Sequence, residues 1–227
     1  MRLSATARCA LAGILLIATQ AAPAREMRGA PAGDFDLYIL ALTWSPGFCA
    51  SGGEARAGDQ CARGSGLGFV VHGLWPQYER GYPAYCGPQG RSPQRRDLDA
   101  VAGVMPSAGL ARYQWRKHGS CSGLAPSGYF EAVGVAFAKV QIPVDYQGKG
   151  LERPTEPLMV ERAFALANPG LRPDMIAVGC GRSDNGSTVL REVRICLTRD
   201  LRNFRPCPDE VERGTCRARS IMVPEVR

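Results

Sequence analysis

Cysteine is the residue type that most constrains how this chain can fold. Nine cysteines occur in 227 residues, and the first of them, Cys9, lies in the N-terminal leader described below. An even number of remaining cysteines in an exported chain is typical of disulfide bonds, here four, although counting alone leaves their pairing open. Zinc is the alternative, but no CxxC or HxxxH spacing occurs, so we expect no metal site. The eight cysteines are Cys49, Cys61, Cys86, Cys121, Cys180, Cys196, Cys207 and Cys216.

Residues 1–24 have the pattern of a cleaved signal peptide. Arg2 and Arg8 provide a positive start, Ala10–Ala18 is an uninterrupted apolar run, and Ala22-Pro23-Ala24 offers the small residues of a cleavage site. The apolar run is far shorter than the roughly 20 residues that span a bilayer. We therefore expect a soluble mature chain, periplasmic or secreted, with no membrane anchor.

The composition is that of an ordinary globular protein. Hydrophobic residues make up 45% and charged residues 22% of the chain, which argues against disorder. Lysine and arginine number 28 against 21 aspartates and glutamates, so the formal net charge is +7. This charge permits a nucleic-acid partner without establishing one. Neither repeats nor a long linker occur, so we expect residues 25–227 to form one domain.

Apolar segments of two kinds predict the secondary structure. Short apolar runs predict strands at Phe35–Trp44, Leu67–Trp75, Met175–Cys180 and Thr188–Leu197. Apolar residues at helical spacing predict helices over Asp97–Met105, after an N-cap at Ser127, and over Leu158–Ala167. Because strands and helices follow in mixed order with few βαβ units, we predict an α+β fold. We expect a central antiparallel sheet flanked by several helices.

The chain has two histidines, and each lies in an unusual segment. His72 lies in the apolar run FVVHGLWPQ (residues 69–77), and His118 lies in YQWRKHGSC (residues 113–121). If the second segment is helical, Gln114, Lys117 and His118 share one face, and Gly119 ends the helix. A lone histidine is more often structural, and a polar stripe is usually a solvated helix face. That interpretation does not account for a glycine-flanked histidine on an apolar strand elsewhere.

Both segments resemble the active-site segments of the T-two ribonuclease family. These proteins are acid, base-nonspecific endoribonucleases, and they include the plant self-incompatibility S-ribonucleases. The run LALTWSPGFC (residues 40–49) and the C-terminal cysteine pattern match as well. The resemblance therefore covers about Phe35 to Cys216, and the chain is similar to the bacterial members.

The resemblance implies cleavage of single-stranded RNA without a metal or a cofactor. In this reaction the 2′-hydroxyl attacks the adjacent phosphorus, and the resulting 2′,3′-cyclic phosphate is then hydrolysed to a 3′-phosphate. By resemblance His118 is the general base, His72 is the general acid, and Lys117 stabilises the charge on the phosphorane oxygens. RNA is the expected partner, and a monomer is expected.

The sequence departs from the family at several positions near these residues. Gln114 stands where the family usually has a glutamate, and Tyr113 where many members have a third histidine. An amide can hydrogen-bond a phosphate oxygen, but it cannot hold His118 protonated. We therefore expect a reduced or pH-shifted enzyme in which the pKa of His118 is lower than in glutamate-bearing relatives. Gln77 occupies the position of an aspartate found in some members, so base preference is expected to differ.

Aromatic and apolar residues are the candidates for base contacts. Trp75 resembles the family tryptophan that packs against a base, and stacking of this kind tolerates many sequences. The further substrate-binding candidates are Gln77, Tyr78, Leu110 and Tyr113. Trp115 is interpreted as a core residue instead, because aromatic residues on helices are usually buried.

The resemblance also implies the disulfide pairing. The pairs are Cys49–Cys61, Cys86–Cys121, Cys180–Cys216 and Cys196–Cys207.

Two rival functions remain. One rival is a catalytically weakened member that acts as an RNA-binding or toxin-like secreted protein, a hypothesis raised by Gln114. The other is a cysteine hydrolase, which the even number of mature cysteines disfavours.

Overall fold

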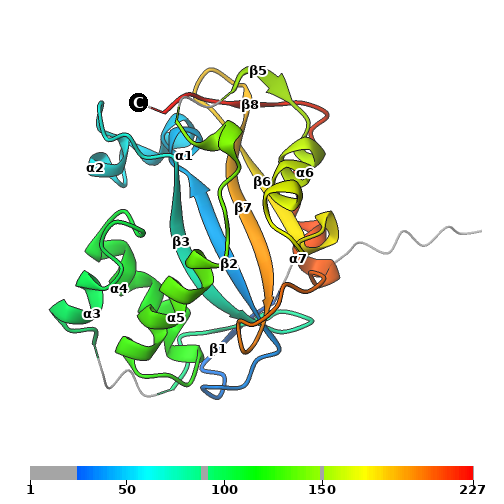
Figure 1. The fold of residues 1–227 in the computed structure, drawn as a ribbon. Helices are drawn as coiled ribbons and strands as arrows, with labels where there is room; N and C mark the ends of the chain where they lie inside the picture. Colours follow the sequence, from blue (N-terminus) through cyan, green and yellow to red (C-terminus); the bar gives the residue numbers. More distant parts are fainter. Residues whose placement is uncertain (1–24, 88–91, 149–150, 227) are drawn as a thin grey trace, which may run out of the picture.

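The long apolar runs of the sequence form the central strands of a sheet. The computed structural model describes residues 25–87, 92–148 and 151–226 (Figure 1), and the predicted signal peptide lies outside them. Strand β2 (Leu37–Trp44) lies between β3 (Phe69–Gln77) and β7 (Thr188–Thr198) and is antiparallel to both. Strand β6 (Ile176–Arg182) continues the sheet beyond β7, again antiparallel. The expected central antiparallel sheet is therefore confirmed.

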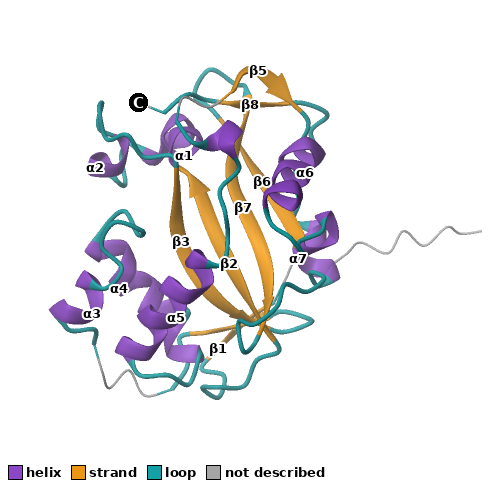
Figure 2. Cartoon of the chain, viewed as in Figure 1, coloured by secondary structure: helices purple, strands orange, loops and turns teal. Residues whose placement is uncertain are grey.

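Shorter strands and helices surround this sheet (Figure 2). The short strands are β1 (Glu26–Arg28), β4 (Tyr82–Ala84), β5 (Leu151–Thr155) and β8 (Ile221–Val223). Strands β1 and β4 form a separate parallel pair, whereas β8 adjoins β7 and pairs with β5. The helices are α1 (Ser45–Phe48), α2 (Gly58–Cys61), α3 (Arg95–Asp99), α4 (Ala108–Lys117), α5 (Pro126–Ala138), α6 (Pro157–Ala167) and α7 (Asp209–Arg213).

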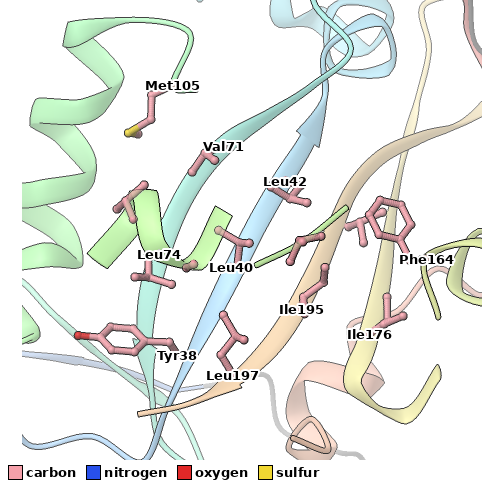
Figure 3. Close-up of a cluster of buried hydrophobic side chains, with 14 of the residues drawn as sticks. Tyr38, Leu40, Leu42, Val71, Leu74, Met105, Phe164, Ile176, Ile195 and Leu197 are labelled. Atoms are coloured by element: carbon pink, nitrogen blue, oxygen red, sulfur yellow. The ribbon is translucent and has the colours of Figure 1, made fainter. Parts of the chain in front are cut away.

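The two faces of β2 pack against different layers. Leu40 and Leu42 belong to the main hydrophobic core, which also contains residues of helices α3 to α6 (Figure 3). Leu37 and Ile39 point to the opposite face and pack in a smaller cluster with the Cys196–Cys207 disulfide. Both faces are therefore buried, as the sequence predicted for this strand. Among the described residues, no helix has the length and apolar character needed to cross a membrane.

Two helix boundaries differ from the sequence-based expectation. The segment predicted as a helix over 97–105 is helical only in α3, and Gly103 then takes a φ of +89°, which a helix cannot accommodate. Leu98, Val101 and Met105 are nevertheless all buried, so their spacing reflected burial rather than a continuous helix. Helix α5 begins at Pro126 and not after a Ser127 cap, since proline at the first helical position loses no hydrogen bond.

The four disulfides form in the pairing that the resemblance implied. They join Cys49 to Cys61, Cys86 to Cys121, Cys180 to Cys216 and Cys196 to Cys207. The Cys86–Cys121 bridge attaches the loop after β4 to the turn that follows α4. Each bridge is expected to contribute about 2–4 kcal/mol to stability.

Gly119 and Gly134 predict opposite effects of the same substitution. A Cβ at Gly119 would lie 2.6 Å from Trp115 Cε3 and 2.9 Å from the Tyr129 ring, whereas a Cβ at Gly134 in α5 would meet nothing within 4 Å. We expect Gly119→Ala to lower the free energy of unfolding by about 1–3 kcal/mol through overpacking. We expect Gly134→Ala to raise it by about 0.5–1 kcal/mol. Urea unfolding with the disulfides intact measures both, and shifts of equal sign would contradict this packing.

Candidate active site

A β-bulge in strand β3 positions His72. On the neighbouring strand β2, Leu42 pairs with Val71 and Ala41 pairs with Gly73, so His72 is the extra residue. Bulges of this kind re-aim a side chain and are frequent beside active sites. The His72 side chain accordingly faces away from the helix-covered core, on the side of the sheet where Ile39 lies.

A second bulge lies in strand β7, on the other side of β2. Here Glu192 pairs with Gly179 and Leu190 with Cys180, which leaves Arg191 as the extra residue. The bulge is the reason why Arg191 and Glu192, although consecutive, both line a cleft on the same side of the sheet as His72. Apolar and polar residues alternate imperfectly at this point of TVLREVRICL, because Arg191 is an extra residue in the strand.

Helix α4 presents the second group of predicted residues. The helix is capped by Ser107, whose Oγ accepts a hydrogen bond from the Leu110 N–H at 3.1 Å, and it ends with His118 as the C-terminal cap. Gln114, Lys117 and His118 lie together on one side of this helix end and line a cleft of about 320 Å³. His72 lines the same cleft, so the structure brings together all four residues predicted to be catalytic.

Trp75 lies between the two histidines. Its ring centroid is 5.2 Å from that of His72 in an edge-on arrangement and 5.2 Å from that of His118 in a stacked one. The Trp75 Nε1–H donates a hydrogen bond of 2.8 Å to Gln114 Oε1. A Cβ at Gly73 would collide with both partners of this bond, so a glycine is needed there.

The His72 ring is held by a carboxylate that sequence reasoning missed. His72 Nδ1 lies 2.7 Å from Glu192 Oε2, and Glu192 Oε1 accepts a hydrogen bond of 2.6 Å from Arg194 Nε. Glu192 is only 8% exposed. Burial alone would raise its pKa, but the hydrogen bond with His72 and the charge of Arg194 outweigh burial and lower the pKa to about 2. The carboxylate is therefore ionised and faces the His72 ring with a negative charge.

His118 occupies the opposite electrostatic environment. It is 6% exposed, and its Nδ1 is buried without a hydrogen-bond partner among the residues that the structure describes. Burial, followed by the positive charges of Lys117 and His72, lowers the pKa of His118 to about 3. The ring is therefore neutral at ordinary pH, in line with the low pKa expected beside Gln114.

Lys117 has two neighbours that the sequence analysis did not identify. Its Nζ lies 3.7 Å from Glu26 Oε2 and 5.7 Å from the centre of the Tyr82 ring. The Tyr82 hydroxyl donates a hydrogen bond of 3.0 Å to the same carboxylate oxygen, and burial together with this bond raises the pKa of Tyr82 to about 12. No motif marks Glu26, because it comes close to Lys117 and Tyr82 only through the pairing of β1 with β4.

The remaining predicted substrate-binding residues are distributed unevenly. Tyr113 is 39% exposed and lines the cleft, and Gln77 lines it as well but is buried, with its Nε2 donating to the Gly81 carbonyl at 2.8 Å. Leu110 lines an adjoining, larger cleft. Tyr78 packs against the hydrophobic core and lines neither cleft.

The environment of Trp115 and the arrangement of potential metal ligands are also visible in the structure. Trp115 is buried in the core and contacts Tyr129, which confirms its structural interpretation. Within the described ranges, no group of three or more histidine, cysteine, aspartate or glutamate side chains is arranged to hold a metal ion.

Comparison with known proteins agrees with this fold. A sequence model of the Ribonuclease T2 family matches residues 35–207, and the chain belongs to this family. A protein named ribonuclease from Aeromonas hydrophila is 35% identical over 203 residues, covering 88% of each chain. Ribonuclease I of Escherichia coli is 31% identical over 160 residues, covering 53% of this chain and 60% of that protein. The self-incompatibility-associated SF11-RNase of Nicotiana alata has the same fold, with a TM-score of 0.61 and 21% identity over 86% of this chain and 100% of that one.

The environment of His118 predicts an unusual titration. In the unmodified protein, where comparison with His72→Gln identifies which NMR signal belongs to which histidine, His118 is expected to remain neutral down to a pH near 3, because protonation would leave a buried cation beside Lys117. Gln114→Glu should raise this pKa, since a carboxylate close to the ring favours the charged form. Gln141→Glu, which adds the same charge at an exposed position, should not change it. An unaltered pKa in the Gln114 variant would argue against electrostatic contact between residues 114 and 118.

Proposed function

We propose that this protein is an endoribonuclease that cleaves single-stranded RNA through a 2′,3′-cyclic phosphate, which is then hydrolysed to a 3′-phosphate. The observation that carries the proposal is the contrast between two imidazoles on one cleft. His118 is buried and neutral, whereas His72 is bonded to an ionised carboxylate. Transfer of a phosphoryl group between oxygens needs one proton acceptor and one proton donor, and the pair supplies both without a metal or a cofactor.

The assignment of roles follows from these environments. Neutral His118 accepts the proton of the 2′-hydroxyl as that oxygen forms its bond to phosphorus. Protonated His72 donates a proton to the 5′-oxygen as its bond to phosphorus breaks. Lys117 lies on the same cleft and stabilises the charge that develops on the phosphorane oxygens.

Gln114 contributes to this site in a different way from a glutamate. An indole N–H can only donate, so the amide oxygen of Gln114 must face Trp75, and its NH₂ group is the end suited to an anion. We propose that this group donates to a phosphate oxygen. The same bond orients Trp75 for stacking on a base, with Tyr113 and Gln77 as the neighbouring contacts.

Glu192 is proposed as the positioning residue for His72. Its hydrogen bond fixes Nδ1 as the protonated nitrogen on the sheet side and leaves Nε2 for the leaving oxygen. Arg194 donates to the other oxygen of the Glu192 carboxylate, and its Cζ lies 5.5 Å from the centre of the Trp75 ring. The carboxylate and Arg194 would hold the His72 ring in the orientation that a general acid needs.

Export and domain organisation form part of the same proposal. We propose that residues 1–24 are a cleaved signal peptide and that the remaining residues form one catalytic domain, monomeric and periplasmic or secreted. Four disulfides support this location, because they form and persist in oxidising compartments. The cysteine hydrolase is disfavoured, since all eight cysteines after residue 25 are paired. A purely RNA-binding role is disfavoured by the opposite electrostatic environments of the two histidines on one cleft.

Product analysis tests the reaction directly. A dinucleoside monophosphate of RNA should yield a 2′,3′-cyclic phosphate and a free 5′-hydroxyl nucleoside, and the deoxy analogue should not be cut, because it lacks the attacking hydroxyl. His72→Ala and His118→Ala should each lower kcat by about 10²–10⁴-fold, the range typical of a lost general acid or base. The reaction is expected to continue in the presence of a chelator. RNA binding without any cyclic product would support the non-catalytic alternative instead.

Glu192→Gln tests the positioning role. The amide accepts a hydrogen bond but carries no charge, so the negative charge beside the His72 ring is lost, and the alkaline limb of the kcat/KM profile should move to lower pH. Glu192→Asp should restore much of the profile, and Glu131→Gln on exposed α5 should leave it unchanged. A lower rate with an unmoved alkaline limb would mean that Glu192 has only a structural role.

A further inference from the structure

A second and larger cleft adjoins the first on the other side of His72. It has a volume of about 910 Å³, against 320 Å³ for the first, and both values lie within the range of ligand-binding sites. The two clefts share His72, Trp75, Tyr113 and Arg194, but His118 and Lys117 line only the first. The two clefts therefore join at His72, the proposed general acid, next to the expected position of the reacting phosphate.

The direction of the substrate follows from the role of His72. The proton from His72 goes to the leaving 5′-oxygen, so the nucleoside that carries this oxygen lies on the His72 side. The second cleft is the space available for it, with Leu110 and Pro106 among its apolar walls. This step rests on the proposed function.

Two arginines stand on the wall of this cleft beyond His72. Arg191 is the bulged residue of β7 and immediately precedes Glu192, whereas Arg56 comes from the segment between α1 and α2. The Cζ atoms of both lie 5.7 Å from the centre of the Phe48 ring. In Figure 1, α2 lies on the same side of β3 as α4, the helix that carries Leu110.

The charge of these arginines is not compensated within the cleft. Glu192 is the one carboxylate among the described residues that line it, and Glu192 is already bonded to His72 and Arg194. No described carboxylate forms an ion pair with Arg56 or Arg191. The wall therefore presents two guanidinium groups, whose planar donors match the oxygens of a phosphate.

We propose that Arg56 and Arg191 form a binding site for the phosphate that follows the leaving nucleoside. The site is separate from the reacting phosphate, which lies with His118 and Lys117 in the first cleft. It would make the enzyme favour RNA that continues past the cleaved bond, and it would discriminate against a dinucleotide that ends in a free 3′-hydroxyl. Both guanidiniums lie over the Phe48 ring and are held there by cation–π contact.

Two substrates that differ by one phosphate test this site. The first is a dinucleoside monophosphate that ends in a 3′-hydroxyl, and the second is the same molecule with a 3′-terminal phosphate. For the unmodified protein, KM should be about tenfold lower for the second substrate, the smaller of the effects expected for charge-assisted hydrogen bonds. Arg56→Ala, Arg191→Ala and the double variant should reduce or abolish this ratio by raising KM for the second substrate more than for the first.

Matched variants separate a specific site from general attraction. Arg162→Ala removes the same charge from an exposed position on α6, which lines neither cleft, and it should retain the tenfold ratio. Arg56 is exposed, so its replacement tests the site even if Arg191→Ala fails to fold. A ratio of one in the unmodified protein, or an equal loss on both substrates in the variants, would overturn the proposal. Failure to cleave either substrate would instead refute the proposed function.

Discussion

The hydrogen-bonded pair of His72 and Glu192 is the interaction on which the chemistry of the site depends. The two residues come from strands on opposite sides of β2, and each lies at or beside a β-bulge. A regular ladder would alternate side chains strictly and could not turn His72, Arg191 and Glu192 to the cleft without exposing core residues. The bulges therefore allow one face of the sheet to remain apolar and packed on the core while the opposite face carries charged side chains.

The rest of the molecule holds the second imidazole opposite this pair. Helix α4 packs on the core through Ala111 and Trp115, and the Cys86–Cys121 bridge secures the turn that follows it. The Trp75 ring contacts both histidine rings, and a hydrogen bond to Gln114 fixes the orientation of its indole. Desolvation beneath the helix end makes His118 neutral, whereas His72 is hydrogen-bonded to a buried, ionised carboxylate, so one scaffold places the two imidazoles in opposite electrostatic environments.

Much of the site was predictable because its residues lie in short continuous motifs. FVVHGLWPQ and YQWRKHGSC each contain their own histidine, and helical spacing alone placed Gln114, Lys117 and His118 together. Glu192, Arg194, Glu26 and Tyr82 were missed, because each contacts a predicted site residue from a strand outside the two histidine motifs. The helix expected over 97–105 was wrong for a related reason, since burial of three apolar residues does not require one continuous helix and Gly103 breaks it.

The amino-acid sequence by itself determined the apolar strands, the paired cysteine set and the residue types that can transfer protons, because these depend on composition and on local periodicity. Only the tertiary structure decided the electrostatic environment of each histidine and the boundary between the two clefts. Those properties depend on burial and on charges within a few ångströms, such as Glu192 beside His72 and Lys117 beside His118. Such proximities arise from strand pairing and helix packing, and a linear pattern does not contain them.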